Sequence, residues 1–127
     1  MTEAEERTMR KAERGRRAWH AGAAAEESVE RLYLRQGLTV AARRWRKGGG
    51  EIDLILRDGD GVVFVEVKQA PDFERAAARV TERQIARIHA GAAHFLAGEP
   101  KGELTPCRFD VALVNATGET RILESAF

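Results

Sequence analysis

The sequence has little of what marks secreted, disulfide-bonded or membrane proteins. Its single cysteine, Cys107, excludes an internal disulfide and a cysteine-cluster metal site, and it fits a reducing compartment. No apolar run approaches the roughly 20 residues that a transmembrane helix needs, and the first 17 residues lack the apolar stretch of a signal peptide. We therefore expect a cytoplasmic protein with no membrane partner, in which Cys107 is a small buried apolar residue.

A large excess of charge of one sign is also missing, because the formal net charge is only +1. The two parts of the chain differ, however: residues 1–47 carry 12 Lys and Arg against 7 Asp and Glu, whereas residues 48–127 carry 9 against 13. This division suggests a cationic surface beside an anionic site, an arrangement that can hold a polyanion near a metal ion. A solvated basic tail is the alternative, and charge alone favours it.

The length of the chain predicts one domain with a hydrophobic core of its own. Residues 1–20 are charged and almost free of large apolar side chains, so we expect a basic N-terminal tail that is helical or disordered. Residues 21–127 then form the predicted domain.

Hydrophobic periodicity in this domain predicts an α/β fold, with a central mixed sheet flanked by helices. One helix is predicted at residues 21–36, and a second begins after Thr81, where Gln84 completes a capping box, and ends before Gly98. Strands are predicted at residues 38–45, 51–57, 62–68, 107–115 and 120–125, with a mobile basic loop at 46–50 and a short helix or structured loop at 69–80.

The second and third predicted strands form a hairpin that carries many charges. Side chains alternate between the faces of a strand, so Glu51 and Asp53 share one face of the first strand, and Glu66 and Lys68 share one face of the second. The opposite faces are apolar. Two registers bury those apolar faces: one places Asp53 opposite Glu66 and Glu51 opposite Lys68, and the other makes Asp53 and Glu66 diagonal neighbours. Both bring two carboxylates together.

Neighbouring carboxylates destabilise a sheet unless something compensates their charge. A divalent cation is the natural candidate, because hard oxygen ligands favour Mg²⁺ or Mn²⁺. Without metal, repulsion should raise the pKa of at least one carboxylate, and Lys68 could position water or stabilise charge on a phosphate. The alternative is structural, since charged residues protect edge strands from aggregation and Glu51 with Lys68 would be a surface ion pair. The residues alone support the two about equally.

An aspartate on one strand followed by Glu-x-Lys on the next resembles the PD-(D/E)XK nuclease superfamily, whose restriction-endonuclease-like fold is shared with archaeal Holliday-junction resolvases. More closely, the chain resembles the uncharacterised bacterial YraN-like family. The matching segments occur in the expected order over residues 20–127, and they read "GAAAEE", "RRWRKGGGEIDLI", "VVFVEVK", "PCRFDVALV" and the terminal "AF". The pairing of "GEIDLI" with "FVEVK" is specific, whereas a lone Glu-x-Lys would mean little.

The resemblance implies a restriction-endonuclease-like sheet in which Asp53, Glu66 and the main-chain carbonyl of Val67 hold Mg²⁺ or Mn²⁺. It matches Lys68 to the catalytic lysine, and it matches Glu26, on the first helix, to an additional acidic position that would share in the metal site. The metal would bind the scissile phosphate and help to generate hydroxide, with Lys68 steadying the water or the transition state. One metal or two stays open, because three carboxylates can share two cations.

Two positions depart from the pattern of the family, and both remove a cation near the expected phosphate. Gln69 and Ala70 stand where a small polar residue and an arginine are usual, and Gln84 stands near a usual lysine at the start of the second helix. The metal ligands are retained. Gln84 is still expected to face the nucleic acid.

The strongest nucleic-acid-binding segment consists of four cations that surround an indole: Arg43, Arg44, Trp45, Arg46 and Lys47. Cations bind phosphates, and an indole can stack on a base. Trp45 could instead anchor the first strand in the core. Glu51 is expected to orient Lys68, with a surface ion pair as the alternative. Arg108 and Asp110 share a strand face and are expected to pair or to brace the sheet.

These observations lead us to expect metal-dependent hydrolysis of DNA phosphodiesters, with branched or single-stranded DNA as candidate substrates. One alternative is a nucleic-acid-binding module that keeps the fold without cleaving, and another is a protein-interaction module whose hairpin charges only keep a strand soluble. A homodimer would suit an enzyme that cuts two strands, although the sequence does not decide this point.

Overall fold

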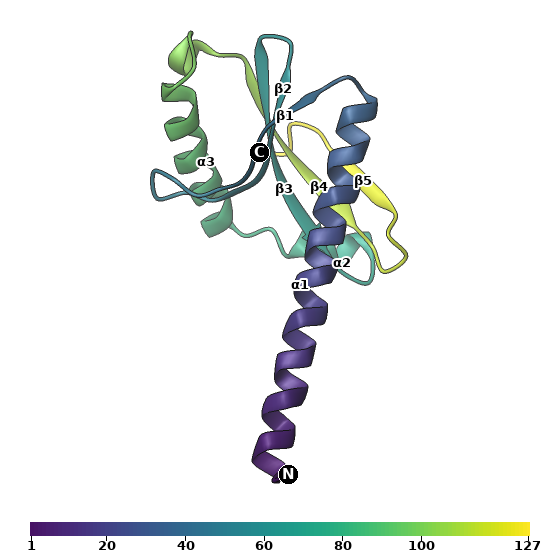
Figure 1. Ribbon diagram of the computed structural model, residues 1–127. Coiled ribbons are helices and arrows are strands. Elements are labelled where there is room, and N and C mark those ends of the chain that lie inside the picture. The colour runs from purple at the N-terminus through teal and green to yellow at the C-terminus, as the bar shows by residue number, and fades with distance from the viewer.

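The protein is described from a computed structural model of residues 1–127 (Figure 1), in which side chains are described for residues 1–14 and 22–127. The side chains of residues 15–20, at the end of the predicted basic tail, lie outside the described residues. The elements are α1 (Glu3–Arg35), β1 (Thr39–Trp45), β2 (Ile52–Asp58), β3 (Gly61–Gln69), α2 (Phe73–Ala78), α3 (Glu82–Ala97), a short 3₁₀ helix η1 (Gly102–Leu104), β4 (Cys107–Val114) and β5 (Thr120–Leu123).

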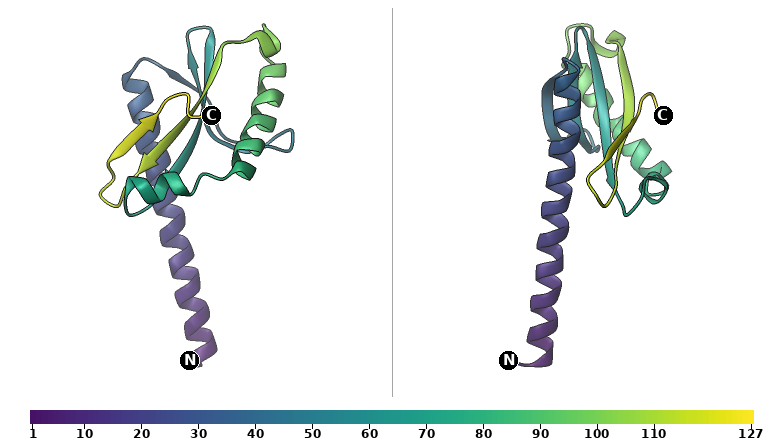
Figure 2. Two further views of the ribbon diagram at one scale, coloured as in Figure 1. Left: turned by 180° about the vertical axis from the view of Figure 1, so that it is seen from behind. Right: turned by 90° about the vertical axis from the view of Figure 1, so that its right-hand side faces the viewer.

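The five strands form one mixed sheet in the order β1-β2-β3-β4-β5. Strands β3 and β4 are parallel, and the other neighbours are antiparallel. A parallel pair needs a long crossover connection, and here it contains α2 and α3. Two views of the ribbon show α1 against one face of the sheet and α2 and α3 on the opposite face (Figure 2). The predicted α/β fold with a mixed sheet between helices is therefore confirmed.

Helix α1 begins at Glu3, within the predicted tail, and runs without interruption to Arg35. The Thr2 hydroxyl accepts a hydrogen bond from the Glu5 amide at its N-terminus, as an N-cap does. Figure 1 shows the N-terminal part of the helix running away from the sheet, and residues 1–14 are exposed. Among the described residues of α1, those that pack in the core are Ala25, Val29 and Tyr33, so the helix supplies core and site residues from its C-terminal turns.

The apolar face of the hairpin lies under α1. The buried residues of this layer are Ala25, Val29, Tyr33, Leu38, Leu54, Leu56, Val63, Val65, Ala112 and Val114. On the other face, α3 covers only the apolar part, where Ile55 and Phe64 pack against Ile88 and Ala92. The charged end of that face, which contains Glu66, is thus left beside the helix and not beneath it.

Ile52 departs from the predicted alternation. Strict alternation along β2 would place Ile52 on the same face as Leu54, but Ile52 packs in the cluster on the α3 side, where its side chain lies close to Gly91. Ile52 is the first residue of β2 and lies before the pairing of β2 with β3 begins at Leu54. Side-chain alternation holds only where the strand is regular, which explains the error.

The loop at residues 46–50 contacts α3 through Gly50, which is buried, while residues 46–49 are exposed, and the mobility of the loop stays a prediction. A Cβ atom on Gly50 would lie 2.2 Å from the Gly91 nitrogen and 2.4 Å from the Arg87 carbonyl oxygen. Only glycine allows two backbones to approach this closely. Gly91, in the middle of a helix where glycine is unfavourable, was the sequence signal of this contact.

A buried polar network joins α1 to the C-terminal strands. Asp110 is 0 % exposed, and its carboxyl group accepts a hydrogen bond of 2.7 Å from the Tyr33 hydroxyl and bonds from Arg108 and the Ser125 amide. The predicted pairing of Arg108 with Asp110 is therefore confirmed. Burial and the acidic partner raise the pKa of Tyr33 far above its usual value, so the phenol stays a donor.

Cys107 is exposed, which corrects the prediction that it is buried. It is the first residue of β4 and precedes the buried part of that strand. Within the described residues, none of the helices combines the length and the apolar character needed to span a bilayer.

Candidate functional site

The register of the β2–β3 hairpin decides whether its carboxylates meet. Leu54 pairs with Val65, and Asp58 pairs with Gly61, across a loop that begins with Gly59 at φ +59°. Two-residue hairpin loops need this positive φ. The first of the two predicted registers is confirmed and the diagonal one is wrong. Continued by one residue, the observed register places Asp53 opposite Glu66.

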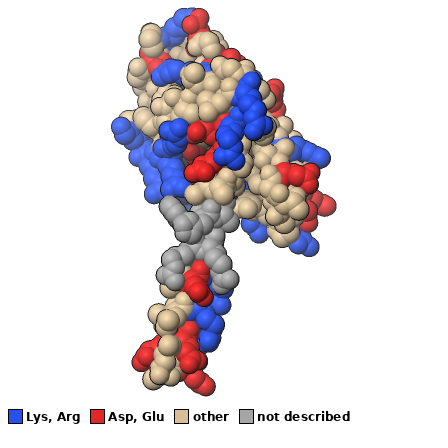
Figure 3. Space-filling view, turned by 45° about the vertical axis from the view of Figure 1, so that its right-hand side comes forward, with Lys and Arg blue, Asp and Glu red and all other residues tan. Residues whose placement is uncertain are grey.

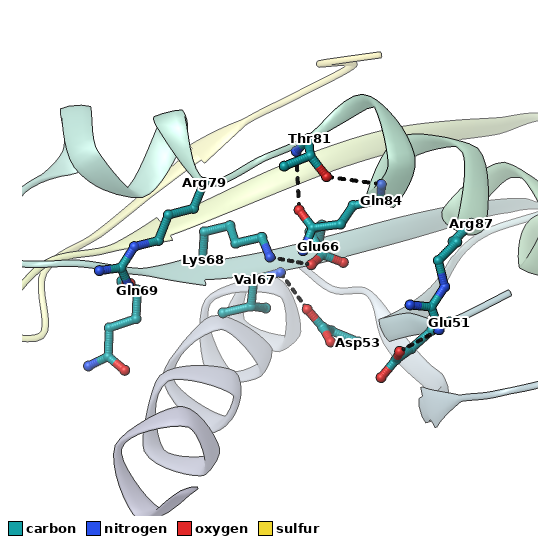
Figure 4. A network of polar contacts seen from close by, with 10 residues as sticks. All are labelled: Glu51, Asp53, Glu66, Val67, Lys68, Gln69, Arg79, Thr81, Gln84 and Arg87. Atoms are coloured by element: carbon teal, nitrogen blue, oxygen red, sulfur yellow. Dashed lines mark hydrogen bonds and ion pairs between the residues drawn. The ribbon is translucent and has the colours of Figure 1, made fainter. Parts of the chain in front are cut away.

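The regular β2–β3 ladder ends at the Leu54–Val65 pair, and Asp53 enters the gap beyond it. Its Oδ2 atom accepts a hydrogen bond of 2.8 Å from the Val67 amide, so a carboxylate replaces a backbone acceptor at this point (Figure 4). The amide and carbonyl groups of a strand residue point toward the same neighbouring strand. The Val67 carbonyl therefore faces the Asp53 side, as the resemblance implied for a metal ligand.

Glu66 and Lys68 lie side by side on the same strand. The Lys68 Nζ atom is 3.2 Å from Glu66 Oε1, and the two side chains are only 16 % and 11 % exposed. Glu51 does not contact Lys68, although the observed hairpin register, extended to the start of β2, would place the two residues opposite each other. It lies before the first residue of β2 and instead contacts Arg46 at 3.2 Å and Arg87 at 3.1 Å, so the expectation that it orients Lys68 was wrong.

The two facing carboxylates are both hard to ionise. Burial, followed by the negative charge of Asp53, raises the pKa of Glu66 to about 7 even though Lys68 opposes the change. Burial also raises the pKa of Asp53, while the Val67 amide and Lys68 lower it. The sequence predicted a raised value from repulsion alone, whereas burial is the larger cause in the folded protein.

Glu26 projects from α1 toward the same place. Its Oε2 atom lies 3.2 Å from Arg44 Nε. Burial raises the pKa of Glu26, and the charge of Asp53 adds to the effect while Arg44 opposes it. Glu26 and Asp53 also line the same surface clefts, so the two carboxylates belong to one acidic region.

Two adjoining clefts connect these groups. One, of about 260 Å³, is lined by Glu26, Glu51, Asp53, Glu66, Val67, Lys68, Gln84 and Arg87, and we call it the acidic cleft. The other, of about 490 Å³, is lined by Ala23, Glu26, Glu27, Glu30, Arg31, Arg43, Arg44, Asp53 and Leu54, and we call it the α1 cleft. Glu26 and Asp53 line both. The fold thus brings together all the residues predicted for metal binding and catalysis.

The sequence profile of the uncharacterised protein family UPF0102 matches residues 25–114. The chain belongs to this family. A UPF0102 protein of Ruegeria pomeroyi is 60 % identical over 116 residues, which cover 91 % of this chain and 94 % of the relative. A UPF0102 protein of Cereibacter sphaeroides is 56 % identical over 113 residues, covering 89 % and 97 %, and one of Dinoroseobacter shibae is 46 % identical over 110 residues, covering 87 % and 82 %.

The resemblance to the YraN-like family is confirmed by this membership. The matched segment of the UPF0102 profile contains Glu26, Asp53, Glu66 and Lys68. The names of these relatives state no activity. Membership of the PD-(D/E)XK nuclease superfamily therefore stays a prediction.

The donor set of this UPF0102 protein suits a hard cation. Two carboxylates and a carbonyl oxygen converge at the end of β2, and such ligands favour Mg²⁺ or Mn²⁺. In the part of the chain with described side chains, no group of three His, Cys, Asp or Glu side chains is arranged to hold an ion by itself. A cation at this place would therefore depend on Asp53, Glu66, the Val67 carbonyl and water, with Glu26 joining only after it leaves Arg44.

The predicted basic segment is engaged within the molecule. Arg43 pairs with Glu30 at 2.5 Å, Arg44 with Glu26, and Arg46 with Glu51. Figure 3 shows acidic side chains gathered between Lys and Arg side chains on one face of the molecule. Arg43 and Arg44 line the α1 cleft, and Arg46 pairs with Glu51 at the acidic cleft, so a phosphate would have to compete with a glutamate for each of them.

Trp45 is half-buried and packs edge-on against Phe95 of α3, with ring centroids 5.2 Å apart. The Lys47 ammonium group lies 4.9 Å from the centre of its ring. These contacts support the alternative in which the indole anchors β1. Stacking of Trp45 on a base stays a prediction.

Residues at the start of α3 line one side of the acidic cleft. The predicted capping box is confirmed, because Gln84 N–H donates to the Thr81 hydroxyl and the Thr81 amide donates to Gln84 Oε1 (Figure 4). This exchange fixes Gln84 at the cleft, and its contact with nucleic acid stays a prediction. Sequence reasoning missed Arg87, which lines the same cleft one turn further along.

Arg79 was also missed. It donates a hydrogen bond to the Gln69 carbonyl, on the edge of β3 that carries the Val67 amide two residues earlier (Figure 4). That edge has lost its β2 neighbour, so its carbonyl needs another donor. The Arg79 side chain thus places a positive charge beside the end of β3, although Ala70 stands where the family usually has an arginine. The only sequence signal was an arginine just before the Thr81 cap, and its partner depends on tertiary packing.

Proposed function

We propose that this UPF0102 protein is a metal-dependent nuclease of the PD-(D/E)XK superfamily, which hydrolyses DNA phosphodiesters with Mg²⁺ or Mn²⁺. One observation carries the proposal: Asp53 and Glu66 converge, largely buried, on the Val67 edge of the sheet, with Lys68 beside them and an open cleft in front. Two such carboxylates lower the stability of the folded chain, and proteins keep this kind of arrangement mainly at functional sites.

The position of the hairpin argues against a protective role for its charges. Charged side chains protect strand edges from pairing with other chains, and β3 has no β2 partner beyond Val65, but there the carboxylate of Asp53 already occupies the Val67 amide. Glu66 is also only 8 % exposed, so it offers little charge to solvent. The burial of Glu66 therefore favours the metal-site explanation over a protective role for the hairpin charges.

The residues of the cleft divide the proposed reaction among them. Asp53, Glu66 and the Val67 carbonyl would hold the cation, which supplies charge neutralisation at the scissile phosphate and an acidified water. Lys68, held 3.2 Å from Glu66, can donate a hydrogen bond to the attacking water or to a phosphate oxygen. The Val67 amide holds Asp53 in place. Arg87 and Arg79 offer further positive charge for the backbone of the substrate, which is proposed to be branched or single-stranded DNA.

One feature favours a second candidate, a module that binds nucleic acid without cleaving it. Gln69 and Ala70 leave the end of β3 with less positive charge than the YraN-like pattern has, and Arg79 only partly replaces it because it is tied to the Gln69 carbonyl. In that case the acidic cleft would still bind metal and nucleic acid. Cleavage alone distinguishes the two functions.

A cleavage panel tests the proposal. Labelled duplex, single-stranded and four-way-junction DNA are incubated with Mg²⁺ or Mn²⁺ and with wild type, Asp53→Asn, Glu66→Gln or Lys68→Met. We expect each variant to lower the cleavage rate by at least about 100-fold, the contribution typical of a catalytic group. Glu103→Gln and Lys101→Met make the same chemical changes on the exposed surface near η1 and should retain activity.

The outcomes separate the candidates. Cleavage that persists unchanged in Lys68→Met and Glu66→Gln would come from a contaminating nuclease and would refute the mechanism. Metal-dependent DNA binding without cleavage by the wild type would favour the non-catalytic module. Calorimetry with Mn²⁺ on wild type and Asp53→Asn shows independently whether the acidic cleft binds metal.

A further inference from the structure

Arg44 connects β1 to α1 next to the acidic cleft. Its Nε atom lies 3.2 Å from the Glu26 carboxylate, and its backbone has φ +49°. This left-handed conformation is uncommon for residues other than glycine, asparagine and aspartate. A residue keeps it only when its surroundings hold it there, and such residues are concentrated at functional sites. The pairing of Arg44 with Glu26 is therefore a candidate part of the site.

Glu26 has two competing uses. It lines the acidic cleft together with Asp53 and Glu66, where a divalent cation is proposed to bind. It also lines the α1 cleft, where Arg44 already neutralises it. A carboxylate that joins a metal ion gives up most of its attraction for a neighbouring guanidinium, so the two cations compete for Glu26.

The position of Arg44 allows it to move. Its side chain is 44 % exposed, so it can leave Glu26 without disturbing the core. A guanidinium binds phosphate through two parallel hydrogen bonds, as it binds carboxylate. The α1 cleft, of about 490 Å³, adjoins the proposed metal through Glu26 and Asp53 and offers space for a phosphate near Arg44.

We propose, on the basis of the proposed nuclease function, that Arg44 alternates between two anions. Without metal it is the counter-ion of Glu26. When a divalent cation in the acidic cleft takes Glu26 as a ligand, the released guanidinium binds a phosphate of the nucleic acid in the α1 cleft. Arg44 is thus a substrate-positioning residue that becomes available only after the metal is bound.

Arg43 provides a matched control. It pairs with Glu30 through two contacts, of 2.5 and 3.1 Å, and Glu30 lines the α1 cleft but not the acidic cleft. Removal of Arg43 therefore changes the charge by the same amount one residue away, without freeing a carboxylate at the proposed metal. An effect that appears on removal of either arginine would reflect the general loss of one positive charge.

The first experiment is calorimetric titration with Mn²⁺. Arg44→Asn removes the cation, and asparagine tolerates the left-handed backbone. We expect Arg44→Asn to bind Mn²⁺ about fivefold more tightly than wild type, the factor that corresponds to one half-exposed ion pair. Arg43→Asn should change the affinity less than about twofold on the same scale. In a Glu26→Gln background, Arg44→Asn should have no effect. An equal gain in both backgrounds would overturn the competition.

The second experiment measures binding of a fluorescent single-stranded phosphorothioate oligonucleotide, which resists hydrolysis, by anisotropy. At saturating Mn²⁺ we expect Arg44→Asn to bind it about fivefold more weakly than wild type, the contribution of one charged contact to phosphate. Without Mn²⁺ the two proteins should bind equally, because Arg44 of the wild type is held by Glu26. An equal loss with and without Mn²⁺ would refute the alternation.

The same titrations separate this inference from the proposed function. If wild type binds no Mn²⁺, or if Asp53→Ala binds it as well as wild type does, the metal site fails and the inference fails with it. If binding depends on Asp53 but Arg44→Asn leaves it unchanged, the metal site stands and only the role of Arg44 is refuted.

Discussion

Replacing Glu66 by glutamine should make the protein more stable at alkaline pH. The ordinary pKa of a glutamate is 4.5, and that of Glu66 is raised to about 7 by burial and by Asp53. The folded chain therefore binds more protons than the unfolded chain between these values. Stability must fall as the pH rises through this window, and it stays low above pH 7. Asp53, whose pKa is also raised, acts in the same direction.

The size of the effect follows from the two pKa values. Each pKa unit corresponds to about 1.4 kcal/mol, so ionising Glu66 lowers the free energy of unfolding at pH 8 by at most about 3 kcal/mol relative to pH 4. Glutamine has the same shape and no charge to bury. It also leaves Lys68 without its partner, but the raised pKa of Glu66 already includes the attraction of Lys68 in the wild type, and the cost of an unpaired Lys68 in the variant hardly varies over this pH range. The informative quantity is therefore the change with pH of the difference between variant and wild type.

Urea denaturation of wild type and Glu66→Gln from pH 4 to pH 8 measures this change. We expect the variant to gain up to about 3 kcal/mol on wild type across the range. Mn²⁺ added at pH 8 should stabilise wild type and not the variant, because a ligand stabilises only the folded state that binds it. Glu51→Gln serves as the control at the rim of the same cleft. Parallel profiles for wild type and Glu66→Gln, or an equal change in Glu51→Gln, would refute the assignment of the effect to Glu66.

Two further predictions concern the framework of the site. Gly50→Ala should lower the free energy of unfolding by about 1 to 3 kcal/mol, as overpacking does, because its Cβ meets the Gly91 nitrogen at 2.2 Å; Gly22→Ala, with open space around it, should not destabilise. Gly50→Ala should also weaken Mn²⁺ binding in calorimetry, and unchanged binding would show that the loop does not position Asp53. Tyr33→Phe should cost about 2 kcal/mol in urea denaturation, since it removes a 2.7 Å bond to buried Asp110; a loss below about 0.5 kcal/mol would mean that Arg108 and the Ser125 amide satisfy that carboxyl group.

Local sequence patterns predicted the helices and strands because each element carries the side-chain periodicity or the capping residues that form it. Strand β3 was expected at residues 62–68 and covers Gly61–Gln69, and the Thr81 capping box marks the start of α3 as predicted. The approach of Asp53 to Glu66 was also predictable, since the hairpin register follows from turn length and from the burial of one face. These features depend on residues close together in the chain.

What the sequence did not reveal depends on contacts between distant elements. The partners of Glu51 and Arg44 lie on different elements, α3 and α1, and no spacing rule connects them. Tyr33 is fully buried, and its hydroxyl group donates a hydrogen bond to Asp110 on β4, a partner 77 residues away in the chain. The close contact of Gly50 with the backbone of α3 likewise forms only when α3 is in place. Charge pairs and close backbone contacts of this kind appear only when the sheet and helices are assembled.

The exposure of Cys107 gives the protein a single natural attachment point for a reporter group. Cys107 pairs with Val62, whereas Lys68 pairs with Leu113 six residues further along the same two strands, a separation of about 20 Å. A fluorophore on this thiol would therefore sit well away from the acidic cleft while remaining joined to it by two rigid parallel strands. Labelling would need no added or removed cysteine, so wild type and every variant above could be compared with the same dye in the same place.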